Sequence, residues 1–176
     1  MSKDVLHADN SVCQRLTTAT KRREFEVVLS PDLLSDGVAR LAEVVAEERV
    51  LIVTTPTVAR LYALPVRAEL LSAGVDVSVL VLPCDESQKR LEHVERICSE
   101  YFRLKLNRQS FLLALGGGVC SDMVTMAASM IRRGVRHVRV PTTLIGQIDA
   151  AIGIKGAVNF DGRKNSLGCY YPPSFV

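Results

Sequence analysis

The sequence predicts an α/β fold with a mostly parallel β-sheet and helices on both faces, and three observations favour this fold class. Largely aliphatic runs at 50–55 (VLIVTT), 75–82 (VDVSVLVL) and 111–115 (FLLAL) are typical of strands covered on both faces. Amphipathic segments with apolar residues at helical spacing separate these runs. Strand and helix therefore alternate, which is the order expected of a parallel sheet with helical crossovers.

Each element follows from its local pattern. Alternation predicts the first strand, Pro56 suits the first turn of a helix, and Gly74 suits a helix end. The expected elements are strands at 24–30, 50–55, 75–82, 111–115 and 137–141, and helices at 31–48, 56–63, 65–74, 88–102 and 119–133. One domain is expected at 23–171, after a loose arm at 1–22 without periodicity. Residues 172–176 begin with two prolines and suggest the start of a linker.

Composition narrows the class of protein. A chain of 176 residues that is 48% hydrophobic can bury one sizeable core and is unlike a disordered chain. It contains neither an apolar run long enough to span a membrane nor a secretory leader, so we expect a cytoplasmic protein with no membrane partner. The five cysteines are scattered without a CxxC pair, which argues against a disulfide framework and against a zinc knuckle.

Positive charge gathers late in the chain. From Ile131 onward there are seven basic and two acidic residues, whereas the preceding part holds 15 basic and 17 acidic residues. This balance suits a small anion such as a phosphate. Nucleic acid is not expected as a partner, because only 5% of the residues are aromatic and no tryptophan is present to stack on bases.

Three consecutive glycines, Gly116, Gly117 and Gly118, lie between a predicted buried strand and a predicted helix. Bare backbone at a helix N-terminus can approach a phosphate closely, and the helix dipole favours negative charge there. The spacing GGGVxxD differs from the GxGxxG of standard dinucleotide folds. A tight turn that merely uses glycine is the alternative.

The stretch from Ala114 to Pro173, ALGGGVCSDMVTMAASMIRRGVRHVRVPTTLIGQIDAAIGIKGAVNFDGRKNSLGCYYPP, resembles the sugar phosphate cyclases, the superfamily of 3-dehydroquinate synthase. DESQK at 85–89 extends the resemblance weakly upstream. It implies that 23–171 is a Rossmann-like NAD-binding domain of the dehydroquinate synthase type. IGIKGAVN and GRKNSLGCYYPP resemble the 2-epi-5-epi-valiolone synthases, whereas dehydroquinate synthases usually carry a glycine in place of Ile154.

The resemblance implies a lyase in natural product biosynthesis that forms a carbocycle from a sugar phosphate, here sedoheptulose 7-phosphate. Family enzymes use bound NAD transiently to oxidise a hydroxyl, eliminate phosphate, reduce the ketone and close the ring by an aldol step. A divalent metal, zinc or cobalt, assists. Its glutamate and histidine ligands lie in a helical domain beyond Val176, so no metal ligand is expected in this chain, which alone is expected to be inactive.

The family's functional positions map onto individual residues. The cofactor positions are Glu86, Lys89, Gly116, Gly117, Gly118, Val119, Asp122, Thr142, Thr143, Lys155 and Lys164. Catalytic positions are Lys155 and Asp149, and substrate positions are Arg133, Asp149 and Asn165. In the family this arginine reaches the substrate phosphate of the neighbouring subunit, which implies a homodimer.

Each of these positions also has a plain structural interpretation. Glu86 and Lys89 can form a surface ion pair, since they are three residues apart. A threonine after Pro141 can cap a helix, and the lysines can be solvated surface charges. Arg132 and Arg133 can simply be favourable charges at a helix C-terminus.

The sequence also departs from the family pattern. Thr55 stands where the family usually has an acidic residue for the adenosine ribose, and Thr125 replaces a glycine that allows close helix packing. His7, His93 and His137 show no metal-binding spacing and suggest surface or hydrogen-bonded residues.

Three other functions stay open. They are 3-dehydroquinate synthase, a metal-dependent polyol or glycerol phosphate dehydrogenase, and a non-catalytic dinucleotide-binding or dimerisation module. DAAIGIKGAVN and GRKNSLG match cyclases and argue against the dehydrogenase.

Overall fold

The computed structural model describes residues 5–6, 12–13, 24–29, 37–83 and 85–176. Of the expected arm at 1–22, it describes only β1 (Val5–Leu6) and β2 (Val12–Cys13), which pair antiparallel. The rest of that arm lies outside the described residues, as do residues 30–36 of the first expected strand and helix.

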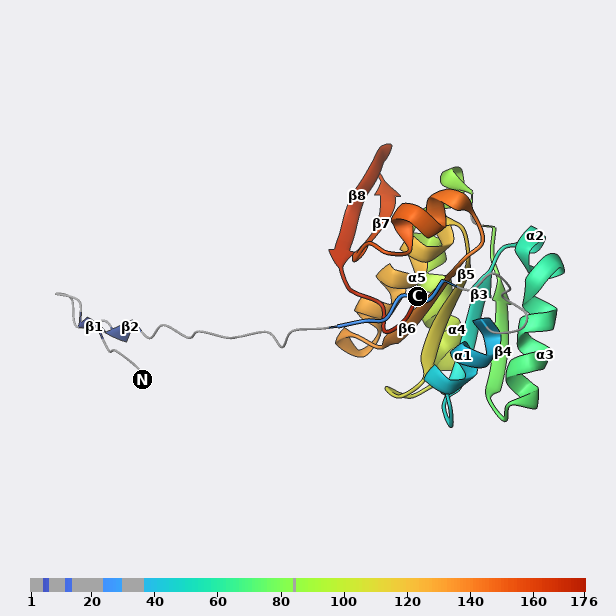
Figure 1. The fold of residues 1–176 in the computed structure, drawn as a ribbon. Helices are drawn as coiled ribbons and strands as arrows, with labels where there is room; N and C mark the ends of the chain where they lie inside the picture. The colour runs from blue at the N-terminus through green and yellow to red at the C-terminus, as the bar shows by residue number, and fades with distance from the viewer. Residues whose placement is uncertain (1–4, 7–11, 14–23, 30–36, 84) are drawn as a thin grey trace.

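A parallel sheet of four strands forms the centre of the fold (Figure 1). Its strands, in the order β4-β3-β5-β6, are β4 (Asp76–Val81), β3 (Arg49–Thr54), β5 (Phe111–Gly116) and β6 (Arg136–Pro141). The register pairs Thr54 with Leu115 and Gly116 with Pro141, so the carboxyl ends of β3, β5 and β6 meet at one edge. This sheet confirms the predicted α/β class.

Helices cover both faces of the sheet. They are α1 (Val38–Val44), α2 (Pro56–Val58), the π-helical turn η2 (Ala59–Ala63), α3 (Leu64–Ser72), the 3-10 turn η3 (Glu86–Gln88), α4 (Leu91–Arg103), α5 (Gly118–Met130), the 3-10 turn η4 (Ile131–Arg133) and the π-helical turn η5 (Gly146–Ala150). Leu51 and Val53 pack in one core cluster with α4 and α5. Val50 and Ile52 point the other way, into a second cluster with α1 and α3.

Two local predictions were wrong. The two helices expected at 56–63 and 65–74 form one helical run from Pro56 to Ser72 with a π-helical turn inside it. Pro65 has no N–H to donate to the Leu61 carbonyl, so a wider turn is expected there. β4 is an edge strand whose Ser78, Val79 and Leu80 are only half-buried, rather than a strand buried on both faces.

The chain beyond η5 forms a β-hairpin that no predicted element covered. β7 (Lys155–Phe160) and β8 (Arg163–Tyr170) pair antiparallel, and β7 packs against α5 (Figure 1). Asp161 and Gly162 make the turn with φ angles of 51° and 71°. An Asp-Gly pair in this conformation is the usual two-residue hairpin turn, so the letters DG carried the signal.

The C-terminal residues, which are expected to begin a linker, pack onto the edge of the sheet. Phe175 is buried, and its carbonyl accepts a hydrogen bond from Arg139 N at 3.1 Å. Val176 N donates to Glu26 O at 3.0 Å, and Val28 N donates to Val176 O at 2.8 Å. The first expected strand is therefore reduced to one bridge, between Glu26 and Phe175. Within the described ranges, no helix is both long and apolar enough to cross a membrane.

Candidate cofactor and substrate site

The glycine turn joins β5 to α5 at the carboxyl edge of the sheet. Gly117 precedes the helix with extended φ and ψ of −81° and −171°, so glycine is not required there for a left-handed backbone. The two glycines instead allow neighbouring side chains to pack close to the backbone. A Cβ on Gly116 would lie 2.9 Å from the Cβ of Cys120, and one on Gly117 would lie 3.2 Å from Thr143 Cγ2. The first N–H groups of α5 have no acceptor within the helix, which leaves them available to an anion.

Buried hydroxyl groups surround this turn. Thr142 donates its backbone N–H to Gly116 O at 3.0 Å, and Thr54 ends the neighbouring strand β3. Within the described residues, the hydroxyl oxygens of both threonines are buried without a hydrogen-bond partner. Buried polar groups normally have partners, so these hydroxyls fit a bound polar ligand. Thr54 was not predicted, although its place at the end of a predicted strand was a signal.

Thr143 behaves differently from Thr142. Its hydroxyl oxygen accepts a hydrogen bond from Gly146 N at 3.1 Å, and its carbonyl accepts one from Gln147 N at 3.0 Å. Thr143 thus caps the helical segment that begins at Leu144 and continues into η5, which is the plain structural interpretation of this residue. A role of Thr143 in cofactor binding stays a prediction.

Lys89 lies at the centre of a buried polar cluster. Its side chain is 5% exposed, and Nζ lies 2.5 Å from Asp122 Oδ2. The same ammonium donates to Asn165 Oδ1 at 2.6 Å, so three predicted site residues from α5, β8 and the turn before α4 meet. The simple alternative, a surface ion pair of Lys89 with Glu86, is wrong. Burial raises the pKa of Asp122, and the charge of Lys89 opposes that rise.

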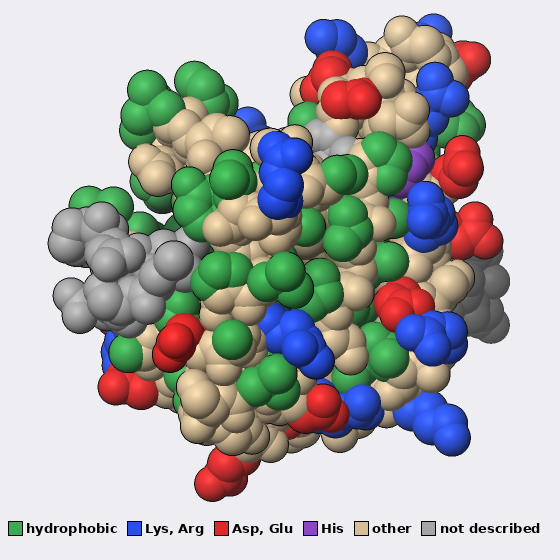
Figure 2. All heavy atoms as spheres, turned by 90° about the vertical axis from the view of Figure 1, so that its right-hand side faces the viewer, with side chains coloured by type: hydrophobic (Ala, Val, Ile, Leu, Met, Phe, Trp, Pro, Cys, Tyr) green, Lys and Arg blue, Asp and Glu red, His purple; other side chains and the backbone are tan. Residues whose placement is uncertain are grey.

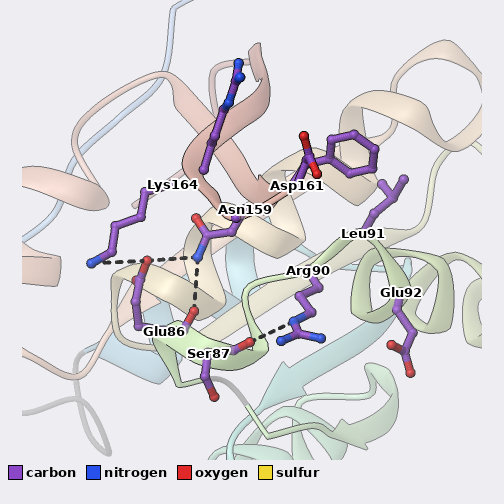
Figure 3. A pocket seen from close by; sticks show the side chains of 11 residues that line it. Glu86, Ser87, Arg90, Leu91, Glu92, Asn159, Asp161 and Lys164 are labelled. Carbon is purple, nitrogen blue, oxygen red and sulfur yellow. Dashed lines mark hydrogen bonds and ion pairs between the residues drawn. The ribbon is translucent and has the colours of Figure 1, made fainter.

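Glu86 and Lys164 meet at a second and more exposed place (Figure 3). Asn159 Nδ2 donates to Glu86 Oε1 at 3.0 Å and to Glu86 O at 3.1 Å. Lys164 Nζ lies 4.0 Å from the same carboxylate oxygen. These residues border a cavity of about 820 Å³ between η3 and the hairpin turn. Asn159 was missed as a site residue, although it ends the quoted IGIKGAVN motif.

A neighbouring cavity of about 480 Å³ brings the predicted catalytic and substrate residues together. Asp122, Asp149, Lys155 and Asn165 are among the residues that line it. Asp149 and Lys155 are exposed, at the end of η5 and the start of β7, whereas Asp122 is half-buried. The cavity thus holds a solvent-facing acid, an amine and a shielded acid, a set that can bind hydroxyl groups and exchange protons with a ligand.

Arg133 is not brought to this site. It precedes β6, whereas Thr142 and the glycine turn lie at the other end of the strand. Six residues of strand span about 20 Å. Arg133 therefore cannot contact the site of its own chain. Val119, by contrast, lies half-buried in the first turn of α5 beside the glycines.

The residues that depart from the family pattern have structural partners. Thr55 accepts a hydrogen bond from Val58 N at 3.3 Å and caps α2. Thr125 is buried against β7, where a Cβ on Gly156 would lie 2.7 Å from Thr125 Cβ. A glycine in the strand thus leaves room for a threonine in the helix.

The described histidines and cysteines do not form a metal site. His93 and His137 are both buried, so neither is a surface residue, and His137 stacks on Tyr171 with ring centroids 5.5 Å apart. His7 lies outside the described residues. Across the described ranges, no group of three or more His, Cys, Asp or Glu side chains can hold a metal ion. Cys120 Sγ instead donates to Val53 O at 3.4 Å, and Cys169 Sγ donates to Thr125 O at 3.9 Å.

Comparisons with known proteins place these residues in context. A family model described as 3-dehydroquinate synthase N-terminal matches residues 79–176. A 3-dehydroquinate synthase from Ruegeria pomeroyi is 37% identical over 154 residues, which are 88% of this chain and 42% of that relative. A second 3-dehydroquinate synthase, from Cereibacter sphaeroides, is 38% identical over the same share of this chain. The chain thus spans about two fifths of the length of such relatives.

Solved structures of similar proteins share the fold of this chain. ValA, the 2-epi-5-epi-valiolone synthase of Streptomyces hygroscopicus subsp. jinggangensis 5008 with NAD+ and Zn2+ bound, aligns with a TM-score of 0.83 and 39% identity, over 92% of this chain and 44% of that one. A 2-deoxy-scyllo-inosose synthase complexed with carbaglucose-6-phosphate, NAD+ and Co2+ aligns with a TM-score of 0.79 and 27% identity, over all of this chain and 44% of that one. A probable glycerol dehydrogenase from Sinorhizobium meliloti 1021, at 17% identity and a TM-score of 0.64 over 88% of this chain and 40% of that one, shares the fold alone.

Proposed function

Because the chain belongs to the 3-dehydroquinate synthase family of sugar phosphate cyclases, we propose that it is the NAD-binding part of such a cyclase. The convergence of Asp122, Asp149, Lys155 and Asn165 in one cavity beside the glycine turn carries this proposal. In the sequence these residues are spread over more than forty positions, and a surface without a function gives no reason to gather them.

The described residues fit a bound dinucleotide. Gly117 and Gly118 leave backbone N–H groups open to a pyrophosphate, and the buried Thr142 hydroxyl needs a partner of the kind that a phosphate or ribose oxygen provides. When bound, NAD would supply a reversible acceptor for the hydride of a carbinol C–H group, while the hydroxyl proton passes to a base. Glu86 and Lys164 border the cavity between η3 and the hairpin turn, where they would contact another part of the cofactor.

The chain's own residues would bind and orient the substrate. Asp149 and Lys155 face the cavity from exposed positions, where a carboxylate and an amine can each hold or move a proton at a sugar hydroxyl. Lys89 holds Asp122 and Asn165 in fixed positions through contacts of 2.5 and 2.6 Å. The described residues do not fit a metal ion, so no step is assigned to a metal here.

Arg133 suits a shared site in a homodimer. Because it lies at the opposite edge of the sheet from the glycine turn, its guanidinium can serve a phosphate only in a second copy of the chain. Sedimentation equilibrium should therefore show a dimer. A strictly monomeric chain at high concentration would contradict this part of the proposal.

The substrate is proposed to be sedoheptulose 7-phosphate, as in the valiolone-type branch. The 39% identity to ValA and Ile154 in the IGIKGAVN motif support this choice. The second candidate is the 3-dehydroquinate synthase reaction, which the names of curated relatives at 37% and 38% identity favour. Thermal stabilisation of the NAD-loaded chain by sedoheptulose 7-phosphate, but not by a heptulosonate phosphate, would favour the first.

Calorimetric titration of the full chain with NAD tests the central proposal. We expect saturable binding that weakens about three- to tenfold in Thr142→Val, which removes one hydroxyl and keeps the side-chain shape. Lys105→Met, beyond the opposite end of the sheet, should bind like the wild type. A folded chain that shows no NAD binding would overturn the proposal.

A turnover assay distinguishes a non-catalytic dinucleotide-binding module from the NAD-binding part of a cyclase. When the chain is mixed with the separately produced metal-binding domain of a cyclase relative, a cyclase part should release phosphate over many turnovers. NAD binding without phosphate release in that mixture would favour the module.

A further inference from the structure

Arg139 is a buried cation at the centre of β6 whose function is not explained by the core around it. Its residue is fully buried, and its hydrogen bonds go to carbonyl and hydroxyl oxygens rather than to a carboxylate. A buried guanidinium normally requires a partner for nearly every N–H group, because desolvating the charge is costly. Where these bonds go therefore shows what the residue does.

Four of the six side-chain hydrogen bonds of Arg139 go to carbonyl groups of residues 150–155, which run from the last residue of η5 to the first residue of β7. Nη1 donates to Ala150 O at 2.9 Å and to Ala151 O at 3.1 Å, and it also bonds to Gly153 O. Nη2 donates to Lys155 O at 3.2 Å. The carbonyls at the end of a helical turn have no partner within it, so a cation from another element caps η5 here.

Thr125 supplies the remaining contact. Its hydroxyl oxygen accepts from Arg139 Nη2 at 2.7 Å and from Nε at 3.1 Å, and it donates to Ser121 O at 2.8 Å. Thr125 lies one helical turn after Asp122 on α5. Arg139 thus ties the α5 helix, which carries one site carboxylate, to the segment between Asp149 and Lys155.

We propose that Arg139 and Thr125 are positioning residues, which fix the 150–155 segment against α5 and thereby place Asp149 and Lys155 in the ligand cavity. Ala150, Gly153 and Lys155 of this segment line that cavity together with Asp149. Neither positioning residue lines it. The consequence for ligand binding rests on the proposed function, whereas the tether itself does not.

Burial supports a role that needs the charge. It lowers the pKa of Arg139, but a guanidinium still remains protonated in a protein. An apolar side chain of similar volume would fill the same space in the core and leave four carbonyl groups without this partner. The cation therefore holds a loop that a purely hydrophobic core could not hold.

Hydrogen exchange, measured by mass spectrometry without ligand, tests the tether. Thr125→Val keeps the side-chain shape and removes the hydroxyl, whereas Thr125→Ser keeps the hydroxyl and removes the methyl group that packs on Gly156. We expect amides of 146–155 to exchange about tenfold faster in Thr125→Val and at nearly the wild-type rate in Thr125→Ser, with β3 and β5 unchanged in both. A role in packing alone predicts the reverse order.

Arg139→Met should increase exchange at 146–155 more than Thr125→Val does. If Arg139→Met does not fold, Thr125→Val and Thr125→Ser alone test the tether. Unchanged exchange at 146–155 in a folded Arg139→Met, or equal effects of the two threonine variants, would overturn the proposal.

Titration with NAD and with sedoheptulose 7-phosphate then distinguishes the tether from the proposed function. Loosening of 146–155 in a chain whose wild type binds neither ligand supports the tether and rejects the proposed function. Weaker binding in Thr125→Val than in Thr125→Ser supports both.

Discussion

Lys89 and Lys164 are both predicted to bind the cofactor, yet the structure places them in opposite physical situations. The Lys89 side chain is 5% exposed and lies 2.5 Å from Asp122, whereas Lys164 is 78% exposed and lies 4.0 Å from Glu86. A buried ion pair is fixed by the core around it, and an exposed pair is loosened by water and salt. Of these two residues, we therefore expect the fold to depend on Lys89 and not on Lys164.

The same contrast divides the site into two regions. The inner region, with Lys89, Asp122 and Arg139, is shielded and is held by hydrogen bonds between distant segments. The outer region, with Glu86 and Lys164, lies at the exposed hairpin turn (Figure 3). We expect substitutions in the inner region to change stability and binding together, and substitutions in the outer region to change binding alone.

Replacing Lys89 should give the largest effect. Lys89→Met leaves Asp122 half-buried without its cation, and we expect the free energy of unfolding at pH 7 to fall by about 3 kcal/mol. That value is the lower end of the range for buried pairs, since the Asp122 side chain is 20% exposed. The matched change Lys164→Met should stay within about 0.5 kcal/mol of the wild type. Urea denaturation measures both, and equal effects would remove the distinction between the two regions.

Only part of this contrast was predictable from the sequence. The four strands of the sheet followed from aliphatic runs or short strand-like segments. Burial on both faces explains such runs in β3 and β5, whereas β4 has a similar run at the edge of the sheet. The Lys89 contacts join segments far apart in the chain, so no local spacing reports them. The plain alternative, an ion pair with Glu86 three residues away, consequently named the wrong partner for Lys89. No sequence pattern indicated the role of Arg139, since its partners are backbone carbonyls and one hydroxyl group distant in the chain.

The hydrophobic face over α2, α3 and β4 shows a second limit of the sequence (Figure 2). Leu61, Leu64, Leu71 and Val81 are exposed there, although Leu61 and Leu71 fall within expected helices and Val81 within an expected buried strand. Pattern predicts which element forms, but the place of β4 at the sheet edge decides whether its side chains are covered.

A smaller effect is expected where the glycine turn meets the core. Gly116→Ala would place a Cβ 2.9 Å from that of Cys120, so the helix start must shift, at a cost of about 1–3 kcal/mol. Gly153→Ala is the matched control, because its new Cβ would make only an ordinary contact of 3.5 Å with Asp149 O. Thermal unfolding of both variants compares them. If Gly116→Ala were as stable as Gly153→Ala, the turn would not be tightly packed.

The smallest expected effect is a pH dependence of the stability that the Asp122 carboxyl group in the inner region contributes. Burial raises the pKa of Asp122 above its ordinary value of 3.8, and Lys89 partly opposes that rise. A carboxyl group with a raised pKa binds its proton more tightly in the folded state, so its contribution to stability is full below pH 3.8 and declines as the pH rises through the folded-state pKa. Carbon-13 NMR titration of the Asp122 carboxyl should therefore give a midpoint above 3.8.

Lys89→Met sharpens this measurement, because it removes the charge that lowers the Asp122 pKa. The midpoint should move further upward, whereas Lys164→Met should leave it in place. The stability lost in Lys89→Met should then shrink as the pH falls below the new midpoint, since a neutral carboxyl group tolerates burial without a cation. A stability loss that stays constant with pH would mean that Lys89 stabilises the fold through the packing of its aliphatic chain and not through its charge.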